Sequence, residues 1–133
     1  MMYKSPIQGW RQYQSRYCLQ GVVCKSCKKP FYPQKYLCSC GSTEFDECKF
    51  KGTGTLFSFT NITSPSAELK DAPTYCIGLI KLDDGPMIMA QLADVKIEDL
   101  KIGMPLKSVF RKFYSNNDDG IVEYGLKFVP KDF

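Results

Sequence analysis

The chain has 133 residues, of which 44% are hydrophobic and 14% aromatic, and its formal net charge is +4. This composition is typical of a folded protein, and no run approaches the roughly 18 apolar residues of a membrane helix or forms a signal-peptide core, so we expect a cytoplasmic protein. No histidine is present, which removes the commonest general base and the Ser-His and Cys-His nucleophile pairs and disfavours an enzyme.

The first predicted element is a short amphipathic helix over residues 6–19. It begins with Pro6, a residue tolerated in the first helical turn. Apolar side chains then recur every three to four residues, at Ile7, Trp10, Tyr13 and Tyr17. Two interpretations of this aromatic face are equally open: it packs on the β-barrel expected in the second half of the chain, or it stays exposed beside Arg11 and Arg16.

Residues 22–49 hold too few apolar side chains for a core and contain two cysteine pairs. Two residues separate Cys24 from Cys27, one residue separates Cys38 from Cys40, and ten residues lie between the pairs. Four thiolates that converge tetrahedrally are the ligand set of a structural zinc ribbon, and their metal binding supplies folding energy. The spacing predicts a zinc ion held by these four residues, with no open position for catalysis.

The second cysteine pair departs from the usual zinc pattern, because it has one intervening residue where two to four are common. Shortening this turn is expected to remove part of the backbone that donates hydrogen bonds to the sulfurs. The alternatives are a vacant or oxidised site, or Cys48 in place of one ligand. The odd total of seven cysteines fits a reducing compartment, and Cys18, Cys48 and Cys76 are expected to be small apolar side chains.

Five strand-like runs follow, separated by turn residues. They cover residues 54–63, 75–82, 87–92, 106–114 and 121–129. A single helical turn is expected at residues 97–100, between the third and fourth runs. This order is that of the OB-fold, a five-stranded partly open barrel, with an SH3-like barrel as the main alternative. The predicted protein is therefore mostly β, with an N-terminal helix (1–21), a rubredoxin-like zinc ribbon (22–49) and an OB-fold (50–133).

Motifs in both halves resemble those of the acyl-CoA-associated OB-fold and zinc-ribbon family, also known as domain of unknown function 35. In the ribbon the matching residues are Cys24, Cys27, Pro33, Lys35 and Cys40-Gly41-Ser42. In the barrel they include Tyr75 to Ile80, Gly85-Pro86, Ala90-Gln91-Leu92, Ile102 to Pro105, Val109-Phe110-Arg111, Tyr124-Gly125 and Phe128 to Pro130. The chain departs from the family at the shortened cysteine pair and at Lys28 and Lys35, where the family often has Gly and Arg.

The resemblance implies a non-catalytic partner of thiolase-superfamily enzymes. For short members like this one it implies a bridge between acetoacetyl-CoA thiolase and 3-hydroxy-3-methylglutaryl-CoA synthase in the mevalonate pathway to isoprenoids. Aromatic and arginine side chains of the helix and ribbon are the candidate contacts for these partners or for the coenzyme A moiety of an acyl-CoA. They are Trp10, Arg11, Arg16, Tyr17, Phe31 and Tyr32.

The rival hypothesis is a nucleic-acid-binding protein, since OB-folds and zinc ribbons both serve that function. The distribution of charge disfavours it. Residues 1–49 contain eight Lys or Arg and three Asp or Glu, whereas residues 50–133 contain ten and eleven. A strand-binding groove in the barrel would be expected to be basic, so the sequence favours the scaffold.

Overall fold

The computed structural model describes residues 5–64, 74–115 and 122–132, without the side chains of Gln14, Arg16, Tyr114, Ser115 and Glu123. The chain divides into two compact units. The first comprises residues 1–51 with 84–86, and the second comprises residues 52–83 with 87–133. The three-part division of the sequence at residues 21 and 49 stays a prediction. No helix in the described ranges is long and apolar enough to cross a membrane.

The predicted N-terminal helix is present as two short helices, α1 (Pro6–Arg11) and α2 (Tyr13–Tyr17). The expectation of one helix over residues 6–19 is therefore wrong in its continuity. The break falls at Gln12, which ends α1 with φ −102° and ψ 3°. The Ser15 hydroxyl donates to the Gln12 carbonyl at 3.0 Å, a side-chain bond that competes with the backbone pattern of a continuous helix.

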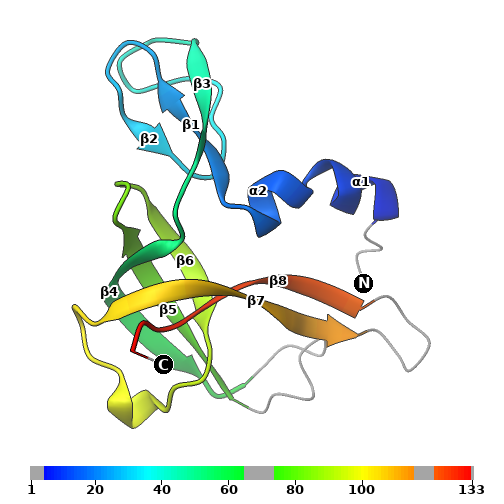
Figure 1. The fold of residues 1–133 in the computed structure, drawn as a ribbon, viewed down its shortest axis with the longest axis vertical. Helices are drawn as coiled ribbons and strands as arrows, with labels where there is room; N and C mark the ends of the chain where they lie inside the picture. The colour runs from blue at the N-terminus through cyan, green and yellow to red at the C-terminus, as the bar shows by residue number, and fades with distance from the viewer. Residues whose placement is uncertain (1–4, 65–73, 116–121, 133) are drawn as a thin grey trace. The chain divides into compact units, whose positions relative to one another are not determined.

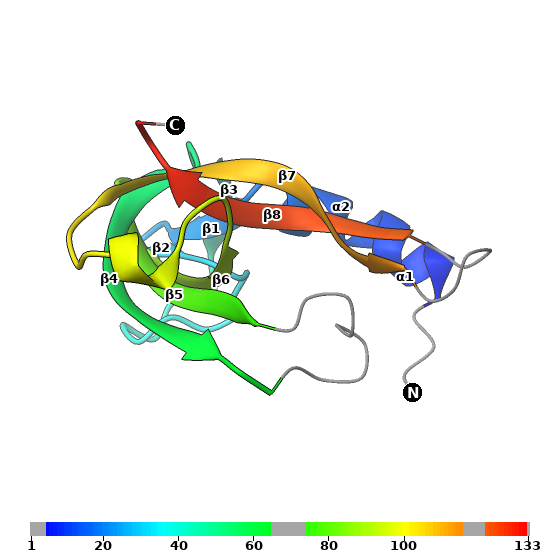
Figure 2. The same cartoon turned by 90° about the horizontal axis from the view of Figure 1, so that it is seen from below.

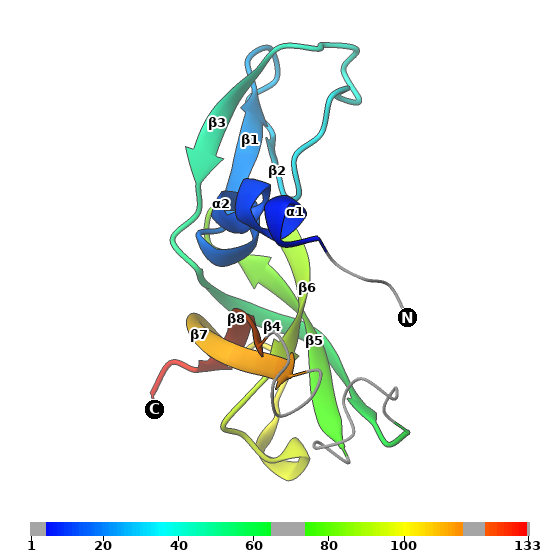
Figure 3. The same cartoon turned by 90° about the vertical axis from the view of Figure 1, so that its right-hand side faces the viewer.

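The ribbon of the first unit is a three-stranded antiparallel sheet of β1 (Gln20–Cys24), β2 (Pro30–Phe31) and β3 (Phe45–Lys49). Figure 3 shows β1 between β2 and β3, in agreement with the strand order. Register pairs Val22 with both Phe31 and Glu47. Few of its side chains are buried, among them Val22 and Cys24, so the ribbon lacks an apolar core large enough to stabilise it alone.

The second unit is a closed barrel of five strands in the order β4-β5-β6-β8-β7 (Figure 1). The strands are β4 (Thr53–Ile62), β5 (Tyr75–Leu82), β6 (Met87–Leu92), β7 (Pro105–Ser115) and β8 (Val122–Pro130). Each bound lies within one residue of its prediction, and a 3-10 turn at Ile97–Asp99 stands where a helical turn was expected. A parallel pair, Leu92 with Phe128, joins β6 to β8 and closes the barrel. The predicted OB-fold is confirmed.

The barrel core consists of large side chains from all five strands. Those with almost no exposed surface are Leu56, Ile80, Leu82, Leu106 and Phe128. Gly78 faces this core, where an added Cβ would lie 2.8 Å from Leu56 Cδ1 and 3.2 Å from Leu92 Cδ1. A side chain at that position would overpack the interior, so the glycine allows its neighbours to fill the barrel.

The β7–β8 hairpin extends beyond the barrel that it closes (Figure 2). β7 pairs with β4 from Pro105 to Lys107, and β8 pairs with β6 at Phe128. Among the described strands, residues 109–115 and 122–127 pair with each other alone; we call this part the hairpin arm. Phe110 and Tyr124 stack on it with ring centroids 5.5 Å apart and are 55% and 45% exposed. The arm thus carries partly exposed aromatic side chains, unlike the enclosed part of the same two strands.

Candidate metal centre

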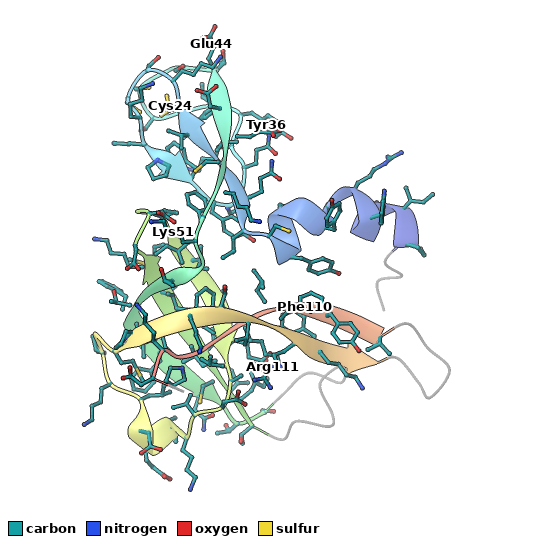
Figure 4. All side chains as sticks on the ribbon, in the orientation of Figure 1. Cys24, Tyr36, Glu44, Lys51, Phe110 and Arg111 are labelled. Carbon is teal, nitrogen blue, oxygen red and sulfur yellow. The ribbon has the colours of Figure 1, made fainter. Side chains whose placement is uncertain are left out.

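The four cysteines of the two predicted pairs lie together at one end of the ribbon, where Figure 4 labels Cys24. The sulfur atoms of Cys24, Cys27, Cys38 and Cys40 all lie within 4.8 Å of one another. Cys24 Sγ is 3.6 Å from Cys40 Sγ, and Cys27 Sγ is 3.4 Å from Cys38 Sγ. Sulfurs bound at about 2.3 Å to one tetrahedral zinc ion stand about 3.8 Å apart. The group therefore fits a metal ion of that size.

Two of the alternatives raised by the shortened pair, an oxidised site and Cys48 as a ligand, do not describe this structure. All seven cysteines are free, and the sulfur separations are well above the roughly 2.05 Å of a disulfide. Cys48 lies half-buried on β3 and is not part of the group. Cys18 is half-buried and Cys76 is buried, as expected for small apolar side chains.

The first cysteine turn is held by two backbone hydrogen bonds. The Lys28 N–H donates to the Cys24 carbonyl and the Cys24 N–H donates to the Lys29 carbonyl, both at 3.0 Å. Lys28 has a φ of 62°, in the left-handed region that glycine tolerates best. The turn thus reverses the chain directly after Cys27 and brings both sulfurs to one side.

The second turn repeats this pattern with one residue fewer. The Gly41 N–H donates to the Cys38 carbonyl at 2.9 Å, and the Cys38 N–H donates to the Ser42 carbonyl at 3.0 Å. Gly41 has a φ of 89°, so it holds the same place as Lys28 in the first turn. Losing one residue therefore shortens the turn but keeps both of the bonds that shape it.

Backbone amides also point at the sulfurs. The pKa of Cys24 is lowered to about 6, mainly by a hydrogen bond from the Cys27 N–H, whereas burial acts to raise this pKa. The Cys40 N–H likewise lowers the pKa of Cys38. At Cys27 the Lys29 N–H acts in the same direction, but the Cys38 thiol, burial and the remaining thiols together raise the pKa to about 11. The shortened turn was expected to lose part of the backbone that donates hydrogen bonds to the sulfurs. Its Cys40 N–H still donates to the Cys38 sulfur.

Burial divides the four residues into an inner and an outer pair. Cys24 is 0% and Cys38 is 3% exposed, whereas Cys27 and Cys40 lie at the surface. Each turn contributes one residue to each pair. With four thiolates bound, a tetrahedral ion has no position left for water or substrate, so such a site can stabilise the ribbon but cannot act as a Lewis acid.

The candidate contact residues whose side chains are described differ in their surroundings. Trp10 is 76% exposed on α1 and lies 5.5 Å from the Tyr13 ring, and Arg11 is also exposed. Tyr17 is half-buried at the end of α2. The Arg16 side chain lies outside the described part of the structure.

Phe31 and Tyr32 instead pack within the ribbon unit. The Phe31 ring meets Phe45 edge to face at 6.3 Å. The Tyr32 hydroxyl donates to the Ser15 carbonyl at 2.7 Å, and its ring packs edge to face on Phe50. These contacts join α2 to the ribbon, which is a structural role.

Sequence reasoning missed two exposed residues beside the metal centre. Tyr36 is 82% and Leu37 is 63% exposed, and both directly precede Cys38. Figure 4 shows Tyr36 on the loop that joins β2 to β3. The signal that could have found them is a pair of consecutive large side chains directly before Cys38, one of the four predicted ligands.

Comparison with known proteins identifies relatives over nearly the whole chain. A DUF35 domain-containing scaffold protein of Methanocaldococcus jannaschii is 39% identical over 130 residues, which cover 96% of this chain and 92% of that protein. A protein of the same description from Methanothermobacter thermautotrophicus is 33% identical over 98% of this chain and 99% of its own length. The chain belongs to the DUF35 family. The resemblance inferred from the motifs is thereby confirmed.

The barrel of this DUF35 protein also matches a family model. Residues 48–111 match the C-terminal OB-fold domain of ChsH2. Among solved structures, the Ltp2-ChsH2(DUF35) aldolase superimposes with a TM-score of 0.71 at 21% identity, over 97% of this chain and 96% of that chain. At this identity the likeness concerns the fold, and it extends over both units of the DUF35 protein.

Proposed function

We propose that this DUF35 protein is a non-catalytic scaffold that bridges acetoacetyl-CoA thiolase and 3-hydroxy-3-methylglutaryl-CoA synthase in the cytoplasm. The observation that carries the proposal is the full-length similarity to DUF35 proteins described as scaffolds. The absence of histidine and the closed character of a four-thiolate site both support a role without catalysis.

The proposed metal is structural zinc bound by Cys24, Cys27, Cys38 and Cys40. Zinc favours four thiolates in tetrahedral geometry, and hard cations such as magnesium or calcium favour oxygen ligands instead. The separations of 3.4 and 3.6 Å between sulfurs suit a zinc ion. Its binding energy would become folding energy for a ribbon with little core.

Bridging would assist a reaction sequence whose first step is unfavourable. Condensation of two acetyl-CoA molecules by a thiolase is uphill, so rapid consumption of acetoacetyl-CoA draws it forward. Holding the synthase beside the thiolase raises the effective concentration of the intermediate at the second active site. The scaffold needs to contact both enzymes and the coenzyme A moiety, and it contributes no reacting group.

The N-terminal helices are proposed as one contact surface for a partner. No residue of α1 is buried, and Ile7, Trp10 and Tyr13 are 61%, 76% and 38% exposed. Exposed tryptophan and tyrosine rings are enriched in the energetically dominant positions of protein interfaces. Arg11, at the end of the same helix, is proposed to contact an acidic group of the enzyme or a phosphate of coenzyme A.

Copurification from the native host tests the proposal. The tagged protein is expected to recover both the thiolase and the synthase in fixed ratios at about 150 mM salt. A Trp10→Ala variant is expected to bind one enzyme about 30-fold more weakly and to recover correspondingly less of it, since a buried interface tryptophan contributes about 2 kcal/mol or more. Met89→Ala, which truncates a 72% exposed apolar residue of the barrel, serves as the matched control and is expected to recover both enzymes in full.

Recovery of neither enzyme, together with a shift of single-stranded DNA at the same salt, would support the nucleic-acid alternative and refute the scaffold. The purified protein is also expected to give no turnover with acetyl-CoA or acetoacetyl-CoA alone.

A further inference from the structure

The ribbon segregates its charges along the chain. Residues 25–41 contain four lysines and no carboxylate, and the next six residues contain Glu44, Asp46 and Glu47. Lys25 pairs with Asp46 at 3.7 Å. Within the described part of the chain no ion pair joins Lys28, Lys29 or Lys35 to a carboxylate, and all three lysines are exposed. The positive charge of this segment is therefore available to a partner.

Two exposed large side chains directly follow one of these lysines in the chain. Tyr36 and Leu37 are 82% and 63% exposed and directly follow Lys35, whose Nζ lies 4.6 Å from the centre of the Phe31 ring. We call Lys28, Lys29, Lys35, Tyr36 and Leu37 the lysine loop. Large apolar side chains together with charges of one sign are the composition of an interface centre with a steering rim.

Both parts of the lysine loop adjoin the candidate metal centre. Lys28 and Lys29 directly follow Cys27, and their backbone groups bond to Cys24 at 3.0 Å. Tyr36 and Leu37 directly precede Cys38, which is 3% exposed. A surface fixed before binding loses less conformational entropy when it docks. A bound metal would thus pre-organise the loop.

Lys28 adopts a backbone conformation that is unfavourable for a residue with a side chain. Its φ of 62° is a left-handed value that costs a residue with a Cβ atom about 1 kcal/mol relative to glycine. The equivalent place in the second turn is held by Gly41, with a φ of 89°. A lysine kept where glycine would be more stable is consistent with a use for its charge.

We propose that the lysine loop is a docking surface for an acidic protein surface, with carboxylates opposite the three lysines and an apolar recess for Tyr36 and Leu37. This inference rests on the proposed scaffold function and assigns one of its two enzyme contacts to the ribbon. A nucleic acid is the less suitable occupant, because the loop offers one exposed aromatic ring rather than a series on which bases could stack.

Charge reversal tests the lysine loop. The variant Lys28→Glu/Lys29→Glu/Lys35→Glu is compared with Lys81→Glu/Lys96→Glu/Lys101→Glu, which reverses three exposed barrel lysines and has the same net charge. Binding of the zinc-loaded proteins to the purified thiolase and to the purified synthase is measured at about 50 and 300 mM salt. The loop variant is expected to lose affinity for one enzyme by about 30-fold or more, and the control by less than about threefold.

The outcomes separate this inference from the function on which it rests. If the wild-type protein binds an enzyme and the loop variant binds it as tightly as the control does, the lysine loop is not the docking surface while the scaffold stands. If the wild-type protein binds neither enzyme, the scaffold function fails and the inference fails with it. Loop-dependent binding of single-stranded DNA, or loop-dependent self-association, would also overturn the inference.

Lys28→Gly gives a second test in which stability and binding move in opposite directions. Relief of the left-handed conformation is expected to raise the thermal midpoint of the zinc-loaded ribbon by a few degrees, about 2–5 °C. Loss of the charge is expected to weaken binding to the same enzyme about threefold to tenfold. Increased stability with unchanged affinity would contradict a docking role for Lys28, and it could not be attributed to misfolding.

Discussion

Replacing Cys24 with serine is expected to reduce bound zinc from one ion per chain to less than about one tenth of that. Cys24 is 0% exposed, and its sulfur lies 3.6 Å from that of Cys40. A serine hydroxyl is a poor zinc ligand at neutral pH, so three thiolates would remain. Because the ribbon has little core, we expect the β1–β3 amides to lose protection from hydrogen exchange while the barrel amides keep theirs.

Elemental analysis and hydrogen exchange measure these two effects, and Cys48→Ser is the control. Cys48 lies on β3 opposite Gly21 and outside the four-sulfur group, so this variant should keep a full equivalent of zinc. A Cys24→Ser protein that retained all of its zinc would refute ligation by four cysteines. Loss of zinc from Cys48→Ser would show that Cys48 replaces one member of the predicted set.

The second large effect is expected in the barrel, where Phe128→Ala should lower the free energy of unfolding by about 3–5 kcal/mol. Phe128 is 0% exposed and provides the parallel pairing with Leu92 that closes the barrel. Truncation would leave a cavity at that closure. The thermal midpoint, followed by far-UV circular dichroism, should fall by more than about 10 °C.

Phe110→Ala provides a matched control on the same hairpin. Phe110 is 55% exposed and stacks on Tyr124 in the hairpin arm of residues 109–115 and 122–127. Since it buries far less surface than Phe128, we expect its truncation to cost less than about 1 kcal/mol. If both variants lost the same free energy of unfolding, the hairpin arm would contribute as much to stability as the barrel core. That result would contradict the expectation based on the exposure of Phe110.

The barrel could be predicted closely because its signals are local. Alternation of apolar and polar residues sets strand faces, and turn residues set strand ends. The same alternation could not predict how far the core covers a strand. Val122, Tyr124 and Phe128 share one period-two pattern, yet they are 40%, 45% and 0% exposed. Exposure depends on where β4 and β6 stop pairing with the hairpin, which is a long-range property.

The grouping of the four cysteines was predictable from the sequence, but the geometry of their turns was not. Spacing identified the four cysteines that the structure brings within 4.8 Å. The shortened pair indicated a weaker turn, because one residue is missing. The structure keeps the two shaping hydrogen bonds since Gly41 takes a φ of 89° one position earlier than Lys28 does in the first turn. Backbone conformation of this kind has no signature in residue spacing alone.

For the N-terminal helix, the sequence predicted the type of element but not its interruption. Its three-to-four-residue periodicity predicted helix correctly, but it did not reveal the break at Gln12. Periodicity counts apolar side chains, whereas the break involves the Ser15 hydroxyl and the Gln12 carbonyl. Residue type likewise does not distinguish the packed Tyr32 from the exposed Trp10, so the candidate contacts chosen by type stay a prediction.

The coupled reaction tests the central claim most directly. Thiolase and synthase are supplied with acetyl-CoA, with and without one equivalent of the zinc-loaded protein, and both free acetoacetyl-CoA and 3-hydroxy-3-methylglutaryl-CoA are measured over time. A non-catalytic bridge predicts faster formation of the final product and less free acetoacetyl-CoA when the protein is present, with no turnover by the protein alone. Unchanged rates and intermediate levels, despite full zinc occupancy, would contradict the bridging function.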